Sequence, residues 1–98
     1  MYTIKMLKAF DNWLNGLKDN RTRIRLARRL EKVSRGNLGD VTSVGEHVFE
    51  MREFFGPGWR MYYVQRGETL IVMLWGGDKS TQSKDISKAK QLAGLLKE

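Results

Sequence analysis

Three runs of apolar and aromatic residues, separated by turn-forming residues, constrain the fold of this chain more than any other feature. They cover residues 48–54, 59–65 and 69–75. Each run is rich in aromatic and β-branched side chains, a composition typical of strands. The Gly-Pro-Gly segment at residues 56–58 cannot continue a strand ladder, and the Arg66-Gly67 pair is short enough to join two antiparallel neighbours. The sequence therefore predicts a meander of three strands.

Much of the remaining chain shows helical spacing. Residues 2–6 alternate weakly and predict a short first strand at the edge of the sheet. Apolar residues three and four apart predict helices over residues 7–18, 21–35 and 80–96. The Asp19-Asn20 pair can cap the second helix, and Gly36 can end it. The apolar side of that helix is expected to comprise Ile24, Ala27, Leu30 and Val33.

The order of these segments predicts an α+β domain. It is β-α-α-β-β-β-α over residues 1–98, with residues 37–45 as a loop. We expect two N-terminal helices packed on one face of a mostly antiparallel four-stranded sheet, followed by a C-terminal helix. A chain of 98 residues is long enough for one core, so a single domain is expected.

The composition favours a polyanionic partner and excludes several kinds of site. Eighteen Lys and Arg against eleven Asp and Glu give a formal net charge of +7. Such a charge attracts RNA, DNA, an anionic membrane surface or an acidic protein, and it also suits a basic soluble protein without any of these partners. The absence of cysteine excludes disulfides and thiolate metal sites and is compatible with a reducing cytoplasm. Because there is no long apolar segment, we expect neither a signal peptide nor a membrane span.

The residue types of the common catalytic sites are scarce. His47 is the only histidine, so neither a His/Cys metal site nor a Ser-His-Asp arrangement is expected. The segment at residues 76–81, Gly-Gly-Asp-Lys-Ser-Thr, lacks the glycine spacing of a nucleotide-binding phosphate loop. Paired glycines directly after a buried strand do predict that another group approaches the backbone closely there. We expect no metal and no cofactor.

Cationic and aromatic side chains remain as candidates for chemistry. Arg52, Arg60 and Lys79 fall in the middle or at the ends of successive strands, where a meander can bring them to one phosphate. Tyr62 shares a face with Arg60 because side chains alternate along a strand, and the amide of Gln82 follows shortly after Lys79. Such a set can grip an RNA backbone and stabilise the charge of a pentacoordinate phosphate. The alternative is that the tyrosines belong to the core and the arginines face solvent.

A second group of cations lies along the second predicted helix. Arg21, Arg25, Arg28, Lys32 and Arg35 step by four and three and therefore share a face. Arg25, Arg28 and Lys32 are candidates for contact with RNA, as is Lys84 on the exposed face of the closing helix. A solvated basic face is the alternative, since charge runs on helices are commonly of that kind.

Five segments carry a resemblance to a known family. They are F-D-x-W-L-x-x-L-K-D at residues 10–19, G-N-x-G-D-V at 36–41, E-M-R at 50–52, G-P-G-W-R-M-Y-Y at 56–63 and G-G-D-K-S-T-Q at 76–82. Together they resemble the RelE/ParE toxin superfamily of bacterial toxin–antitoxin modules, most closely its HigB-like, phage-derived branch of addiction-module killer proteins. The likeness covers nearly the whole chain.

The resemblance implies a type II toxin that acts as a ribosome-dependent mRNA interferase in the cytoplasm. Such a metal-independent endoribonuclease cleaves mRNA on the ribosome and is neutralised by a cognate antitoxin, here expected to be a HigA-like helix-turn-helix protein, with no membrane partner. Arg60 matches the arginine after the glycine-aromatic pair of the RelE-like pattern, and Lys79 is the nearest counterpart of its second cation. Two lysines of that pattern fall near Val48 and Glu50, and its tyrosine falls near Asp85.

These residues suggest a mechanism and leave other functions open. The 2′-hydroxyl of RNA would attack the neighbouring phosphate, with Arg60 and Arg52 stabilising the equatorial oxygens and Lys79 near the attacking or leaving oxygen. Proton transfer could fall to Tyr62, Glu50, Asp78, or to the ribosome and solvent. The alternatives are a ParE-like toxin that inhibits DNA gyrase by protein contact and a noncatalytic nucleic-acid-binding module.

Overall fold

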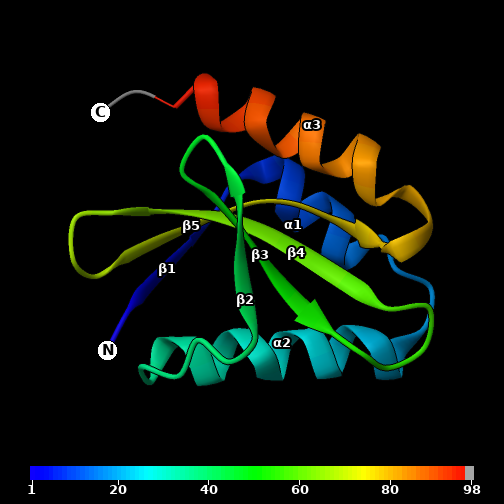
Figure 1. Ribbon diagram of the computed structural model, residues 1–98. Helices are drawn as coiled ribbons and strands as arrows, with labels where there is room; N and C mark the ends of the chain where they lie inside the picture. Colours follow the sequence, from blue (N-terminus) through cyan, green and yellow to red (C-terminus); the bar gives the residue numbers. More distant parts are fainter. Residues whose placement is uncertain (97–98) are drawn as a thin grey trace.

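A five-stranded mixed sheet forms the middle layer of the protein, with helices on both of its faces (Figure 1). The computed structural model describes residues 1–96. The strands are β1 (Thr3–Met6), β2 (Val41–Gly45), β3 (Val48–Glu53), β4 (Trp59–Arg66) and β5 (Leu70–Asp78). Their order across the sheet is β1-β5-β4-β3-β2, and only the β1–β5 pair is parallel. The predicted α+β class, the meander and the edge position of the first strand are thus confirmed.

The helices occupy the predicted segments; the first and the last are shorter than predicted, and the second is shifted by one residue. They are α1 (Lys8–Asn15), α2 (Asn20–Ser34) and α3 (Gln82–Gly94), with a short 3-10 helix η1 (Lys79–Thr81) before the last. The Asp19 carboxylate accepts a hydrogen bond from the backbone N–H of Arg21 and so caps α2. Gly36 follows that helix with φ +100°, a conformation that favours glycine, as predicted for a residue that ends it.

The prediction of four strands was wrong because residues 41–45 form a strand, β2, in the segment expected to be a loop. Gly39 and Gly45 suggested a loop, but they bound a short edge strand that pairs antiparallel with β3. Apolar and polar residues alternate only weakly in this segment, so the sequence pattern did not reveal a strand. The strand forms because pairing with β3 supplies its backbone hydrogen bonds. Glu46 and His47 connect the two strands, and both have positive φ.

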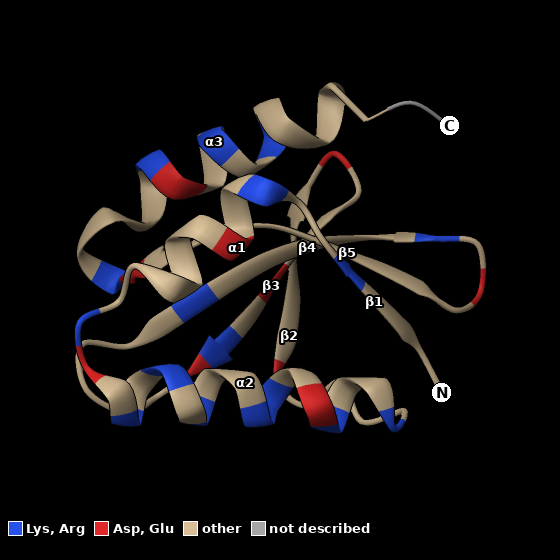
Figure 2. Ribbon diagram, turned by 180° about the vertical axis from the view of Figure 1, so that it is seen from behind, with Lys and Arg blue, Asp and Glu red and all other residues tan. Residues whose placement is uncertain are grey.

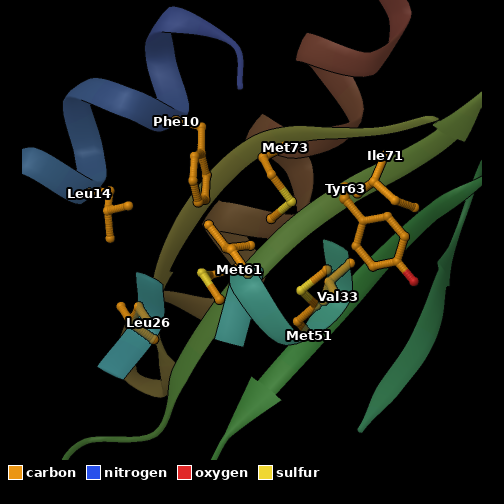
Figure 3. Close-up of a cluster of buried hydrophobic side chains, with 10 residues drawn as sticks. Phe10, Leu14, Leu26, Val33, Met51, Met61, Tyr63, Ile71 and Met73 are labelled. Carbon is orange, nitrogen blue, oxygen red and sulfur yellow. The ribbon is translucent and has the colours of Figure 1, made fainter. Parts of the chain in front are cut away.

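The face of the sheet under α1 and α2 holds the larger core cluster (Figure 3). Its buried members are Phe10 and Leu14 from α1, Leu26, Leu30 and Val33 from α2, and Met51, Met61, Tyr63, Ile71 and Met73 from the strands. The two N-terminal helices therefore share one face, as expected. Three methionines in this cluster provide flexible side chains that fill irregular space between helix and sheet.

The buried side of α2 matches the predicted one in part, because Leu30 and Val33 are buried as expected. Ile24 and Ala27 are exposed. The residues that the helix buries are Thr22, Leu26, Arg29, Leu30 and Val33. Thr22, Leu26, Arg29 and Val33 follow one another in steps of four, three and four residues, which is the spacing of one side of a helix. The apolar pattern was misassigned because this side contains an arginine.

The opposite face of the sheet carries α3 and a smaller core cluster. Its buried members are Val48, Tyr62, Val64, Val72, Leu74 and Ala89. A bulge in β5 adds to this face, because Tyr62 pairs with Trp75 and Tyr63 pairs with Met73, which leaves Leu74 between them. Among residues 1–96, no helix is long and apolar enough to cross a membrane.

Candidate nucleic-acid interface

The three predicted cations of the strands lie at one end of the sheet, where β3 and β5 end and β4 begins. Arg52 and Arg60 are direct partners in the β3–β4 pair, and Arg60 is the partner of Gly77 in the β4–β5 pair. A methyl group placed on Gly58 would lie 3.5 Å from Lys79 Cβ and 3.7 Å from Arg60 Nη1. Lys79 and Arg60 thus border the same glycine. The structure brings Arg52, Arg60 and Lys79 together, as the strand pattern predicted.

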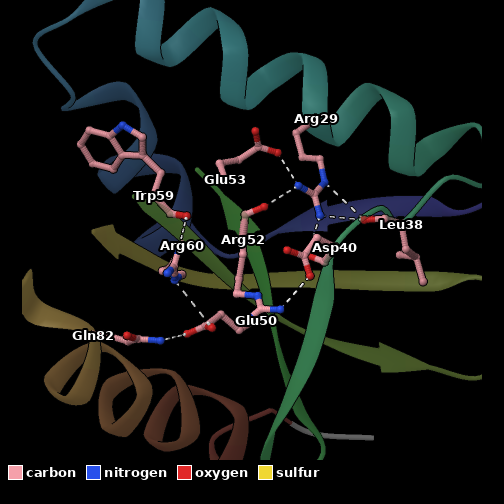
Figure 4. Close-up of polar contacts among 9 residues, drawn as sticks. All are labelled: Arg29, Leu38, Asp40, Glu50, Arg52, Glu53, Trp59, Arg60 and Gln82. Carbon is pink, nitrogen blue, oxygen red and sulfur yellow. Dashed lines mark hydrogen bonds and ion pairs between the residues drawn. The ribbon is translucent and has the colours of Figure 1, made fainter. Parts of the chain in front are cut away.

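Arg60 is held inside this end of the sheet (Figure 4). Its side chain is 7% exposed, and its Nε lies 3.7 Å from Glu50 Oε1 in an ion pair. Nη1 donates to the Trp59 carbonyl at 3.2 Å, which is the one hydrogen bond that the guanidinium makes among residues 1–96. An arginine has five N–H donors, so most of the hydrogen-bonding capacity of Arg60 is unused.

Glu50 connects Arg60 to α3. Its other carboxylate oxygen, Oε2, accepts a hydrogen bond of 2.9 Å from the Gln82 side chain at the start of the helix (Figure 4). The carboxylate is buried between the sheet and α3. The predicted RNA-binding residue Gln82 therefore orients the acid that pairs with Arg60, and one of its two amide N–H donors is used in doing so.

Tyr62 lies on the same face as Arg60, as predicted, but it is fully buried. Its hydroxyl has no hydrogen-bond partner within the described residues. Burial, together with the negative charge of Glu50, raises the pKa of this phenol far above its usual range. A closed, neutral phenol cannot contact RNA at the surface, so the structure does not support the catalytic role predicted for Tyr62.

The other two cations of this end are more accessible. Arg52 donates from Nη2 to Asp40 Oδ1 at 2.9 Å and remains half-buried, while Lys79 is exposed at the start of η1. Asp78 caps η1 by accepting from the Ser80 backbone N–H at 2.8 Å. Each of the two arginines is thus paired with a carboxylate, whereas Lys79 makes no ion pair within the described part of the chain.

The paired glycines at the end of β5, Gly76 and Gly77, allow two side chains to pack against the backbone from opposite faces of the sheet. A Cβ on Gly76 would lie 2.3 Å from the Trp13 ring, and a Cβ on Gly77 would lie 1.9 Å from Asp85 Oδ2. Asp85 also accepts hydrogen bonds from Trp75 Nε1 at 3.0 Å and from the Thr81 hydroxyl at 2.6 Å. The predicted close approach to this backbone is made by the protein's own helices, and it clamps α3 onto the sheet.

The predicted basic ridge is exposed along α2, where blue segments recur in Figure 2. A cavity of about 200 Å³ opens on this helix beside the end of β3, lined by Arg25, Arg28, Arg29, Lys32 and Glu53. Arg25 lies over the Phe55 ring, with its guanidinium carbon 3.8 Å from the ring centroid. Lys84, the fourth cation predicted to bind RNA, is exposed on α3, on the other side of the sheet.

The sequence interpretation missed Arg29, which is buried beneath the ridge (Figure 4). Its guanidinium donates to the carbonyls of Leu38, Asp40 and Arg52, and it is also paired with Glu53. Its position on the stripe of Leu26 and Val33 was the signal that could have revealed it. Arg29 fastens the loop before β2 and the end of β3 to α2.

The aromatic residue Phe54 was also missed as a site residue. It follows β3 directly and is 72% exposed, with the guanidinium carbons of Arg52 and Arg60 at 5.8 and 5.7 Å from its ring centroid. This exposure was not predicted because the apolar strand was expected to extend through Phe54, whereas β3 ends at Glu53. Within residues 1–96, no group of three or more His, Cys, Asp or Glu could hold a metal ion.

Comparison with known proteins identifies a relative of this chain. No protein-family model matches it. An uncharacterized protein of Haemophilus influenzae is 43% identical over 93 residues, a match that covers 95% of this chain and 94% of that protein. The chain therefore belongs to the same family as this Haemophilus influenzae protein.

Proposed function

We propose that this protein is the toxin of a type II toxin–antitoxin system in the RelE/ParE superfamily and acts as a ribosome-dependent mRNA interferase. The observation that carries the proposal is Arg60, a buried guanidinium with unused donors, beside Arg52 and Lys79 at one end of the sheet. A phosphate at this position would meet three cationic side chains, of which Arg52 and Arg60 are each paired with one carboxylate and Lys79 with none among the described residues. The net charge of +7 adds attraction for RNA over the whole surface.

In the proposed reaction, the protein stabilises charge and positions the RNA. The 2′-oxygen forms a bond to the adjacent phosphorus as the bond from phosphorus to the 5′-oxygen breaks, which leaves a 2′,3′-cyclic phosphate and a 5′-hydroxyl. Arg60 and Arg52 would bind the equatorial oxygens, and Lys79 would lie near the leaving oxygen. Strand pairing sets the two backbones side by side, and Glu50 and Asp40 hold the guanidiniums of Arg60 and Arg52 before RNA arrives.

The candidate acids and bases of the protein are not available for proton transfer in the proposed reaction. Tyr62 and Glu50 are closed to solvent, and the carboxylate of Asp78 is used to cap η1. We assign removal of the proton from the 2′-hydroxyl, and its delivery to the 5′-oxygen, to water and ribosomal groups. A positioned acid or base contributes only ~10²–10⁴ in rate, so alignment of mRNA by the ribosome can supply much of the catalysis.

The sheet and its partners fit the same proposal. We place the fold with the RelE-like toxins, with β2 as an added edge strand beside the predicted four. The expected setting is the cytoplasm, with a HigA-like helix-turn-helix antitoxin as the neutralising partner. An acidic antitoxin segment would find complementary charge on α2 or at the end of the sheet.

The test is 5′-end mapping of a reporter mRNA after brief induction in cells, with the start codon intact or destroyed. We expect cuts within the coding region that disappear when translation is abolished and fall about 10²–10³-fold with Arg60→Ala. Lys5→Ala, an exposed cation on β1 at the sheet edge, is the matched control and should cut like the parent. Cuts that persist on untranslated RNA would identify a free ribonuclease instead.

A ParE-like gyrase inhibitor is the second candidate, because Arg52 and Arg60 each have a carboxylate partner. Such pairs can hold the end of the sheet together without any substrate. Growth arrest with intact mRNA and fragmented chromosomal DNA would select this function. Salt-sensitive RNA binding without cleavage would select a noncatalytic binding module.

A further inference from the structure

Phe54 is unusual among the exposed apolar side chains of the described residues. The large hydrophobic residues exposed there are Met1, Met6, Ile24, Phe54 and Leu95. Only Phe54 is aromatic, and only its ring has guanidiniums nearby. The distances of 5.7 and 5.8 Å from the ring centroid to the guanidinium carbons are near the outer limit of a cation–π contact, so the ring is not covered by either arginine.

The neighbouring Phe55 shows what a covered ring looks like in the same loop. Arg25 lies 3.8 Å from its centroid, and the ring packs against the core cluster under α1 and α2. A hydrogen bond of 3.1 Å from the Gly58 N–H to the Phe55 carbonyl closes the turn that follows. Phe55 and this turn anchor the loop, so Phe54 is presented from a fixed backbone.

We propose that Phe54 stacks against an unpaired base of RNA, next to the phosphate-binding arginines. Single-stranded RNA is recognised by aromatic rings that stack on splayed bases and by guanidiniums that bind the adjoining backbone. Here one exposed ring lies within 6 Å of two guanidiniums, in a protein of net charge +7. The inference rests on the proposed function, because it gives the RNA bound at Arg60 a second point of contact.

A substitution series separates stacking from simple apolar contact. Phe54→Ala should weaken RNA binding and slow cleavage roughly 5- to 150-fold, the range that one base–aromatic stack contributes. Phe54→Trp and Phe54→Tyr should keep most of the activity, while Phe54→Leu should resemble Phe54→Ala. Leu95→Ala is the matched control, because Leu95 is 73% exposed at the end of α3, and it should have no effect. Full activity of Phe54→Leu would overturn the stacking assignment.

Photocrosslinking identifies what the ring touches. The photoreactive analogue p-benzoylphenylalanine is placed at position 54 or at position 95 of the full chain, and cells are irradiated during brief induction. We expect a ribonuclease-sensitive adduct from position 54 and none from position 95. Adducts from position 54 to protein alone would mean that Phe54 is a protein-docking residue and would overturn the inference.

The two experiments distinguish failure of the inference from failure of the proposed function. Normal mRNA cleavage by Phe54→Ala would remove the stacking role and leave the mRNA interferase intact. The opposite result would be an RNA adduct from position 54 in cells that contain no cleaved mRNA, with the Phe54→Leu protein competing poorly for that RNA. It would support stacking and rule out the nuclease activity. Thermal unfolding of each variant checks that the chain is folded.

Discussion

Two arginines are almost closed to solvent in this protein, and their surroundings differ. Arg29, in α2, directs hydrogen bonds to three backbone carbonyls and is paired with Glu53. Arg60, in β4, makes one hydrogen bond and has a carboxylate oxygen at 3.7 Å. The first guanidinium has all of its donor nitrogens occupied, whereas the second retains unused donors at the end of the sheet. Burial alone therefore does not distinguish a structural arginine from a binding one, but the use of its donors does.

Removal of the Arg29 guanidinium should have the largest effect on stability. Arg29→Ala leaves three carbonyls and Glu53 without their partner, and we expect a loss of about 3–5 kcal/mol in the free energy of unfolding. Arg60→Ala should cost less, about 1–3 kcal/mol, because Glu50 keeps its hydrogen bond from Gln82. Urea denaturation monitored by circular dichroism measures both. Equal losses would remove the contrast between the two arginines, and Arg28→Ala serves as the exposed control.

The second prediction concerns α3, which covers the Arg60 region and leaves the Arg29 region untouched. Gly77→Ala places a methyl group against Asp85 and should force α3 outward, at a cost of about 1–3 kcal/mol. Hydrogen exchange should rise at the start of α3 and stay unchanged in α2. Gly94→Ala, where the space is open, should be neutral or gain up to about 1 kcal/mol. A stable Gly77→Ala variant would mean that the helix is not clamped there.

A third experiment uses a site far from both arginines. Glu46 and His47 have φ of 54° and 64°, a conformation that costs side chains about 1–2 kcal/mol per residue relative to a right-handed one. Glu46→Asn with His47→Gly provides preferred residues for this turn and should raise stability by about 1 kcal/mol. Added to Arg29→Ala, the pair should restore part of the stability. Added to Arg60→Ala, it should raise stability without restoring cleavage, as reporter mapping would show.

The smallest effect is expected for Tyr62→Phe, which removes a buried hydroxyl without a partner. At neutral pH we expect a change within about 0.5 kcal/mol and normal cleavage. The pKa of Tyr62 is higher in the folded than in the unfolded chain, so its contribution to stability is complete below pH ~10 and is lost as the pH rises further. Denaturation midpoints measured across this range should fall less steeply for Tyr62→Phe. A large loss of cleavage at neutral pH would return Tyr62 to the active site.

The elements that the sequence predicted well are those whose local pattern and tertiary role agree. The strands around Met61 and Met73 and the capped second helix are of this kind. β2 was missed because its pairing with β3, rather than its composition, makes it a strand. β5 continues through its two glycines to Asp78, because the side chains of Trp13 and Asp85 pack against them. This cause lies in α1 and α3 and is not visible in the sequence of β5 itself.

The sequence predicted which cationic residues lie at the candidate site, but it did not predict how the residues around them are buried or exposed. The predicted meander brought Arg52 and Arg60 near each other, and the register of the β3–β4 pair confirms that they are direct partners. The burial of Tyr62 depends on how closely α3 packs over the sheet, which no spacing in the sequence measures. Exposure of Phe54 depends on where β3 ends, and apolar composition alone does not fix that position.

The parallel pairing of β1 with β5 bears on how the chain folds during synthesis. Thr3 is the partner of Leu70, and α1 packs on β5, so β1 and α1 find this neighbour only after β5 has been translated. Pairing between residues so distant in sequence is slow, because the intervening loop must close first. Until then the strand at the N-terminus has no sheet to join. The antiparallel β3–β4 pair, which brings Arg52 beside Arg60, is local in sequence, so this end of the sheet can form before β1 joins it.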